Sequence, residues 1–207
     1  MKLFMWPGSC AIGIRVLLEE IGRPYQAVPV NLVAKQQYSP DFLAINPKAK
    51  VPALLRDDGS LLTEFGAIAW WLARSFPDAG LMPDGAENEA RAAELMDYVV
   101  ATVHMRGFNR VIAPQSYAFS PEDYDAVRER GLEIIRSGFA IIADALQGRT
   151  HVLDRYSFAD AALFYVEHWT ATRVPLALPP ACARHYEGML RRPAVERALA
   201  GDALVVA

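Results

Sequence analysis

The sequence predicts an α+β N-terminal domain followed by an all-α domain, and three observations support this. Over residues 1–76, short apolar runs with the residue types of strands alternate with helical patterns. Residues 77–85 are rich in Pro and Gly, which marks a linker. From residue 86 onward the apolar residues recur with helical spacing only. We therefore place the two domains at residues 1–78 and 86–207.

The chain opens with a strand, a sharp turn and a helix. Lys2–Trp6 is a short apolar strand, and Pro7-Gly8-Ser9 interrupts it with strong turn residues. The helix that follows begins at Cys10, and Gly22 and Pro24 end it. A helix N-terminus favours an anion, so this position predicts a lowered pKa and a nucleophilic thiolate for Cys10. The alternative is a small buried hydrophobic residue, and the position alone leaves both open.

The rest of the first domain completes a small mixed sheet. The pattern predicts a strand at 25–32 parallel to the first, and then a short helix with Ser39 as cap and Pro40 at its first position. A strand at 50–55 follows, with Pro52 near its start, and an antiparallel strand at 61–62 returns beside it. The last element is a helix that begins at Thr63-Glu64 and carries Phe65 on its buried stripe. This β-α-β-α-β-β-α order is that of a thioredoxin-like sheet.

The second domain is predicted to be helical throughout. The helices expected are 89–111, a helix to about 147 capped by Ser120, one capped by Ser157-x-x-Asp160, 178–190 and 193–199. The helix after Ser157 is apolar all round, as a central buried helix is, so its capping box serves folding. His104 has helical spacing to Val100 and Phe108, where a lone histidine is usually structural.

Composition excludes several function classes. The 207 residues are 53% hydrophobic and 22% charged, the balance of a globular protein with a sizeable core. A net charge of −3 offers no basic surface to nucleic acid or to an anionic membrane. No apolar run approaches membrane-spanning length, and the apolar start is too short for a signal peptide. Two cysteines suit a reducing, cytoplasmic location.

Five stretches carry a resemblance to a known family. They are Met-Lys-Leu-Phe-x-x-Pro-Gly-x-Cys at 1–10, Asn-Pro-Lys-x-x-Val-Pro-Ala-Leu at 46–54, Asp-Asp-Gly-x-Leu-Leu-Thr-Glu at 57–64, Ala-Thr-x-His at 101–104 and Ser-Phe-Ala-Asp-Ala at 157–161. In this order and spacing, the whole chain resembles the glutathione transferases, most closely the bacterial beta class. The resemblance implies a cytoplasmic homodimer, glutathione as co-substrate and a role in detoxification.

The resemblance also implies catalytic residues. Cys10 matches the beta-class cysteine that contacts the glutathione sulfur and can form a mixed disulfide with it. Ser9 supplies a neighbouring hydroxyl, whose ordinary role is a helix cap. His104 matches a histidine that reaches the same sulfur from the helical domain.

Four further positions match the family's glutathione-binding residues, and a fifth departs from them. Val51-Pro52 matches a cis-proline dipeptide whose valine backbone pairs with the cysteinyl part of glutathione; the alternative is a trans proline at a strand start. Glu64 matches the partner of the α-ammonium group, although any acid is favoured at a helix start. Lys35 matches a lysine near the glycyl carboxylate, and is otherwise a surface lysine. Phe65 departs from the family's serine or glycine, so only its backbone N–H is left for the γ-glutamyl carboxylate.

The function expected is conjugation of glutathione to a small hydrophobic electrophile. The alternatives are thiol–disulfide exchange through Cys10, with glutathionylated substrates, and a non-catalytic ligand-binding member of the fold. No metal is expected, because the histidines make no ligand spacing with either cysteine. Trp70, Trp71 and Arg74 lie outside the core stripe of their helix, which predicts a dimer interface.

Overall fold

The computed structural model describes residues 1–206, with side chains up to residue 202, and divides into two compact units. One unit joins residues 1–82 to the C-terminal segment from Leu190, and the other is Pro83–Met189. The sequence predicts that all of residues 86–207 belong to the helical domain, whereas the last helix packs against the first helix of the chain. The reason is that an amphipathic helix shows which face is apolar, but not which distant element covers that face.

A four-stranded sheet forms the centre of the first unit, as predicted. Its strands are β1 (Lys2–Met5), β2 (Gln26–Pro29), β3 (Ala53–Leu55) and β4 (Leu61–Thr63), in the order β2-β1-β3-β4. β2 is parallel to β1, while β3 is antiparallel to both β1 and β4. The strands are shorter than their apolar runs, and Pro52 lies just before β3, where no ladder N–H is needed.

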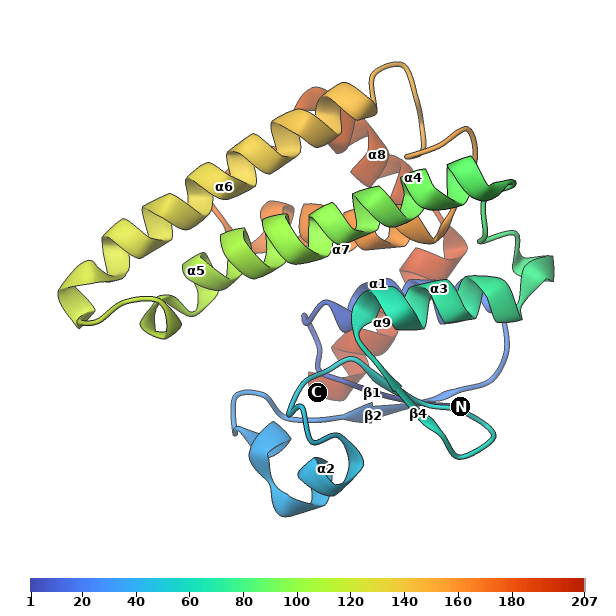
Figure 1. Ribbon diagram of the computed structural model, residues 1–207, viewed down its shortest axis with the longest axis horizontal. Coiled ribbons are helices and arrows are strands. Elements are labelled where there is room, and N and C mark those ends of the chain that lie inside the picture. The colour runs from blue at the N-terminus through green and yellow to red at the C-terminus, as the bar shows by residue number, and fades with distance from the viewer. Residues whose placement is uncertain (207) are drawn as a thin grey trace. The chain divides into compact units, whose positions relative to one another are not determined.

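Four helices complete this unit: α1 (Ala11–Ile21), α2 (Pro40–Ile45), α3 (Phe65–Ser75) and α9 (Pro193–Val206). α1 and α3 lie on one side of the sheet and α2 on the other (Figure 1). Two local predictions are confirmed: Gly22 ends α1 in the left-handed conformation, and Ser39 Oγ accepts the Phe42 N–H at 3.3 Å. α9 is longer than the expected helix at 193–199 because its apolar pattern continues beyond that point.

The second unit is helical throughout, as predicted. Its long first helix runs without a break through α4 (Ala86–Asp97), the π-helical stretch η3 (Tyr98–Phe108) and α5 (Asn109–Ile112), and lies beside α6 (Tyr124–Ala145) (Figure 1). Glycines allow that approach, since a Cβ on Gly131 would lie 2.8 Å from the carbonyl oxygen of Gly107. α7 (Phe158–Arg173) is the buried central helix, followed by α8 (Pro180–Leu190). None of the helices described could cross a membrane.

The two predicted caps in this unit have different outcomes. Ser157 and Asp160 form a capping box at the start of α7, as predicted. The prediction for Ser120 is wrong, because its hydroxyl donates to Asp123 Oδ2 at 3.4 Å and caps no helix. A 3₁₀ turn, η5 (Pro121–Asp123), comes first, and α6 begins only at Tyr124. Proline fixes φ but does not choose between an α-helix and a 3₁₀ turn.

A charged cluster lies in the core of the second unit. His185 is 2% exposed and sits between two fully buried carboxylates, with Nδ1 2.7 Å from Glu167 Oε2 and Nε2 3.1 Å from Asp160 Oδ1. Burial alone lowers the pKa of His185, but the two carboxylates outweigh it and raise that pKa to about 10. The imidazolium is therefore the stable form at neutral pH.

Candidate functional site

The turn after β1 positions Ser9 and Cys10. The Ser9 N–H donates to the Trp6 carbonyl at 2.9 Å, which closes the turn. Ser9 Oγ accepts the Ala11 N–H at 3.3 Å, so Ser9 caps α1. That bond uses the hydroxyl oxygen as acceptor and leaves the hydroxyl hydrogen available to an anion. Cys10 already has helical backbone angles, φ −60° and ψ −13°, as the first residue after the cap.

The Cys10 thiol is buried, with 8% of the residue exposed. Loss of solvent is the largest effect on its pKa and raises it to about 12; the residue's own N–H opposes this rise and the Glu64 carboxylate adds to it. The prediction of a lowered pKa is therefore wrong. A helix dipole contributes on the order of 1 kcal/mol, which is less than the cost of ionising a thiol away from water. At neutral pH Cys10 is a neutral S–H group.

The loop before β3 is built around a buried asparagine. Asn46 is 1% exposed; its side-chain amide donates to the Lys50 carbonyl at 2.8 Å and its Oδ1 accepts the Lys48 N–H at 3.1 Å. The Val51–Pro52 peptide bond is cis, as predicted. Among the residues that the structure describes, none pairs with the backbone N–H or C=O of Val51.

Glu64 is the residue before α3, with an unusual positive φ of 71°. Its carbonyl accepts the Ile68 N–H at 3.0 Å, so α3 begins at Phe65, one or two residues later than expected. The carboxylate makes no cap hydrogen bond and is mostly exposed. Instead, Lys48 Nζ lies 2.8 Å from Glu64 Oε1 and 2.9 Å from Thr63 Oγ1.

Lys48 is a candidate site residue that the sequence analysis missed. It stands in the matched stretch 46–54, three residues before Val51, and this placement was the only signal for it. A lysine in a polar loop is usually a surface residue, and its partner is 16 residues further along the chain. Periodicity and caps do not reach that far.

Phe65 and Lys35 occupy opposite environments. Phe65 is 5% exposed and packs on the buried face of α3 with Ile68 and Leu72, as predicted. Its ring is therefore part of the core. Lys35 is exposed in the loop after β2, with a left-handed φ of 57°. No described residue pairs with its ammonium group.

The register of the sheet brings the segments that carry the predicted site residues to the same end of the strands. Phe4 on β1 is opposite Ala53 on β3, and Ala53 is opposite Thr63 on β4. The turn that carries Ser9 and Cys10 follows the end of β1, the cis dipeptide precedes the start of β3, and Glu64 follows the end of β4, so all three lie at the same end of the strands. The effect of Glu64 on the Cys10 pKa reflects the same proximity. Residues far apart in sequence thus form one polar site.

His104 belongs to the other unit, on η3. Its Nδ1 lies 3.3 Å from the Tyr165 hydroxyl, and its ring meets the edge of Trp169 at 4.8 Å between centroids. Its predicted reach to a glutathione sulfur stays a prediction. A groove of about 600 Å³ between α4 and α6 contains none of the predicted site residues. Within the described part of the chain, no three His, Cys, Asp or Glu side chains are grouped to hold a metal ion.

Comparison with known proteins identifies the family. Residues 1–74 match the model of the glutathione S-transferase N-terminal domain. The chain is 34% identical to glutathione S-transferase GstA of Escherichia coli O157:H7, over 99% of this chain and 100% of that protein.

Two solved structures show the same fold along nearly the whole chain. One is a sphingomonad glutathione S-transferase complexed with glutathione, with 32% identity, a TM-score of 0.85, and coverage of 99% of this chain and 100% of that one. The other is a bacterial beta class glutathione S-transferase of Sphingomonas chungbukensis, with 29% identity, a TM-score of 0.84 and the same coverage. With the sheet register, the cis dipeptide and these matches together, the chain belongs to the glutathione S-transferase family.

Proposed function

We propose that the protein conjugates the thiolate of glutathione to a small hydrophobic electrophile. The observation that carries this proposal is the convergence of three segments at one end of the sheet's strands: the Ser9–Cys10 helix start, the Val51 backbone, which pairs with none of the described residues, and Glu64. Together they offer hydrogen-bond donors for the glutathione sulfur, backbone groups for strand pairing and a carboxylate. These are the partners that a γ-glutamyl tripeptide needs. The sphingomonad relative, named as a complex with glutathione, supports the same ligand here.

The donors at the start of α1 stabilise the glutathione thiolate. Cys10 is neutral because burial raises its pKa to about 12, so its S–H can donate to an anionic sulfur. The Ser9 hydroxyl hydrogen and the positive end of the α1 dipole act in the same direction. Each lowers the pKa of the bound glutathione thiol. The thiolate then attacks the electrophilic carbon, forms the C–S bond, and the leaving group departs with its electron pair.

The remaining groups hold the tripeptide. The N–H and C=O of Val51, next to Pro52, pair with the cysteinyl backbone as an added strand does. Glu64 binds the α-ammonium, and the γ-glutamyl carboxylate lies at the Phe65 end of α3, where the dipole favours an anion. Lys35 pairs with the glycyl carboxylate. For His104, the family resemblance implies a role at the same sulfur.

Thiol–disulfide exchange by Cys10 is the less favoured function. It requires the Cys10 thiolate as the attacking group. Because burial raises the pKa of Cys10 to about 12, the thiol form predominates at neutral pH. This protonation state disfavours the residue as a nucleophile and favours it as a hydrogen-bond donor.

Three measurements on the purified protein separate the functions. Formation of a coloured thioether from glutathione and a chromogenic aryl halide supports the transferase. Turnover of a mixed glutathione disulfide without aryl halide conjugation would show the oxidoreductase instead. If neither reaction occurs while calorimetry shows glutathione binding, the protein is a binding member of the family.

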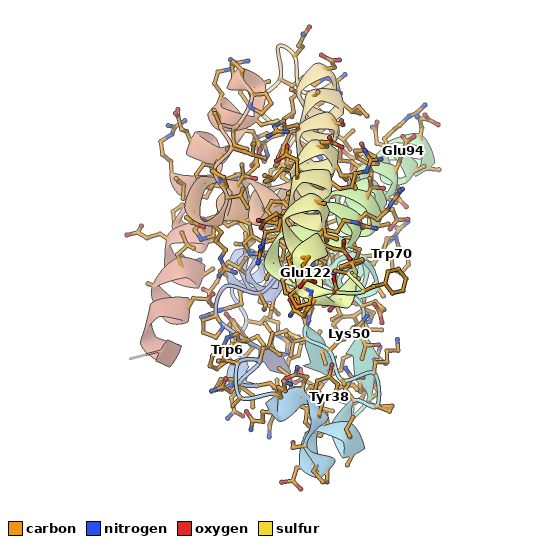
Figure 2. The ribbon with its side chains drawn as sticks, turned by 90° about the vertical axis from the view of Figure 1, so that its left-hand side faces the viewer. Trp6, Tyr38, Lys50, Trp70, Glu94 and Glu122 are labelled. Carbon is orange, nitrogen blue, oxygen red and sulfur yellow. The ribbon has the colours of Figure 1, made fainter. Side chains whose placement is uncertain are left out.

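We also propose a cytoplasmic homodimer that acts in detoxification. Trp70, labelled in Figure 2, is 46% exposed on α3, and the Arg74 guanidinium lies 5.7 Å from its ring centroid. Trp71 beside it stacks edge-on with Phe76. A contiguous exposed apolar patch marks an interface, and Trp70 supplies apolar surface for such a patch. If the protein sediments with the mass of a single subunit at micromolar concentration, the dimer is excluded.

A further inference from the structure

The carboxylate of Asp202, on α9, contacts the turn that carries Ser9 and Cys10, the two proposed hydrogen-bond donors to the glutathione sulfur. The Gly8 N–H donates to Asp202 Oδ2 at 3.1 Å, across 194 positions of sequence and within one compact unit. Gly8 precedes Ser9 and Cys10 directly and has a left-handed φ of 74°. This bond therefore connects α9 to the start of the candidate site.

Asp202 is itself fixed from the opposite side. The Arg15 guanidinium on α1 lies 2.6 Å from Asp202 Oδ1, and the two side chains are only 7% and 13% exposed. Arg15 Nε also donates to the Tyr25 hydroxyl at 3.3 Å, and Tyr25 donates to Glu19 at 2.9 Å. Each oxygen of Asp202 thus has its own partner. Because Arg15 neutralises the carboxylate, Asp202 can lie near the thiol donors without opposing a negative charge there.

The residue before Asp202 is shaped for this contact. A Cβ added to Gly201 would lie 1.9 Å from Arg15 Nη2 and 2.9 Å from its Cζ. A larger residue at 201 would displace the guanidinium, and with it the partner of Asp202. Gly201 therefore leaves the space that the Arg15 guanidinium occupies beside Asp202.

We propose that Asp202 is a positioning residue, which holds the Gly8 amide and so fixes the Ser9 and Cys10 donors relative to the glutathione sulfur. This inference rests on the proposed function. Donors stabilise a developing charge only when their geometry is held, and a displacement of about 1 Å costs up to a hundredfold in rate. In this proposal Asp202 contacts neither the Cys10 sulfur nor the glutathione sulfur, and it acts only through its bond to the turn.

The test compares variants that disturb the same helix pair in different ways. Asp202→Ala removes both contacts of the carboxylate, while Asp202→Asn keeps an oxygen that can accept the Gly8 N–H. The matched control is Arg197→Ala, which breaks the bonds from Arg197 to the Glu19 carboxylate and carbonyl, at 2.8 and 2.9 Å, also between α9 and α1. The control loosens the helix pair without touching the turn.

The readouts are the pH profile of kcat/KM, the absorbance of the bound glutathione thiolate, and the glutathione Kd. We expect Asp202→Ala to move the acid limb to higher pH and to reduce the rate below neutral pH about tenfold, with the glutathione Kd nearly unchanged. Asp202→Asn should restore part of the profile, and Arg197→Ala should leave it unchanged. Equal profiles for Asp202→Ala and Arg197→Ala would overturn the proposal, as would an acid limb in Asp202→Asn that moves as far as in Asp202→Ala. If the alanine variant does not fold, Asp202→Leu replaces it, because leucine also lacks an acceptor for the Gly8 N–H.

A second readout does not depend on conjugation. If the protein conjugates nothing, the proposed function fails, and the alkylation rate of Cys10 at alkaline pH then tests the positioning alone. A loosened turn exposes Cys10, so Asp202→Ala should be alkylated several-fold faster than both the wild type and Arg197→Ala. Equal rates in all three proteins would refute the role of Asp202.

Discussion

The ammonium group of Lys48 lies 2.8 Å from Oε1 of Glu64, so the carboxylate proposed to bind glutathione already holds a cation. The two side chains are 52% and 61% exposed. An ion pair with that exposure contributes at most about 1 kcal/mol, so a ligand ammonium can replace it at little cost. Lys48 therefore keeps Glu64 neutralised while the site is empty and competes with the ligand when it arrives.

Glu64→Gln should weaken glutathione binding about tenfold, because a hydrogen bond to a charged group contributes roughly 1.5–3 kcal/mol. Lys48→Met should have the opposite effect on affinity: it should lower the glutathione Kd a few-fold, because the ammonium that competes for Glu64 is removed. Calorimetry with glutathione and with an analogue lacking the α-amino group measures both. The Glu64→Gln loss should disappear for the analogue. Equal losses for the two ligands would assign Glu64 another role.

Native Cys10 should resist alkylation. Burial raises the pKa of both Cys10 and Cys182 to about 12, with Glu64 adding to the first and Glu167 to the second. Iodoacetamide at neutral pH should therefore label neither thiol in the folded protein, and both after unfolding in denaturant, as counted by intact mass. Rapid labelling of Cys10 in the native protein would show a thiolate there and favour disulfide exchange.

Cys10→Ser should keep much of the conjugation rate, since a hydroxyl replaces the S–H donor. Cys10→Ala removes the donor and should lose about tenfold in kcat/KM, with Ser9 retaining the rest. The aryl halide assay across pH measures this, and the acid limb of Cys10→Ala should move to higher pH. Identical profiles for the serine and alanine variants would exclude a donor role for Cys10.

Phe65→Ser should separate stability from binding. The ring is in the core, so its loss should reduce the free energy of unfolding by about 3–5 kcal/mol in urea titrations. The new hydroxyl supplies a side-chain donor for the γ-glutamyl carboxylate and should tighten glutathione binding about tenfold. Phe65→Leu is the control, since it retains most of the packing and adds no hydroxyl. Weaker or unchanged binding in the serine variant would show that the carboxylate lies elsewhere.

The buried cluster around His185 should make stability depend on pH. The pKa of His185 is about 10 in the folded protein, because the Glu167 and Asp160 carboxylates outweigh burial, and about 6.5 when unfolded. The folded state therefore holds the proton more tightly. Its stabilisation is complete below about pH 6.5 and is lost as pH rises through about 10.

His185→Gln removes this contribution and should destabilise the protein by about 3–5 kcal/mol, since the buried Asp160, whose pKa is lowered to about 2, then loses its cationic partner. The difference in unfolding free energy between wild type and variant should shrink as pH rises from neutral to 10. Urea titrations at several pH values measure it. A difference that does not change over this range would show that His185 is neutral in the fold.

The parts of the fold that the sequence predicted depend on short-range contacts. The Gly22 terminus, the Ser39 cap and the Ser157–Asp160 box each involve residues within four positions of one another. Period and composition also placed the strands, because one face of each must be buried. The cap prediction for Ser120 is wrong because its local sequence suits several backbone geometries, including the 3₁₀ turn that forms there. The π-helical stretch has no local signal at all.

The candidate site was predictable only in part. The motif positions placed Cys10, Val51 and Glu64, and the sheet register brings them together. The protonation of Cys10 was not predictable, because burial depends on every element that surrounds the thiol. The Asp202–Gly8 bond spans 194 positions. Contacts of that span depend on the assembled packing, which a single sequence does not display.

The assignment of α9 to the first unit has a consequence for biosynthesis. The ribosome releases α1 well before α9, so the β-sheet unit lacks one of its helices until α9 has been made. The helical unit, Pro83–Met189, is continuous in the chain and can fold while synthesis proceeds. A nascent chain that stops before Pro193 leaves α1 without its cover and Arg15 without Asp202. Such a product exposes buried surface to chaperones and proteases, so the turn with Ser9 and Cys10 gains its Asp202 contact only after α9 has been made.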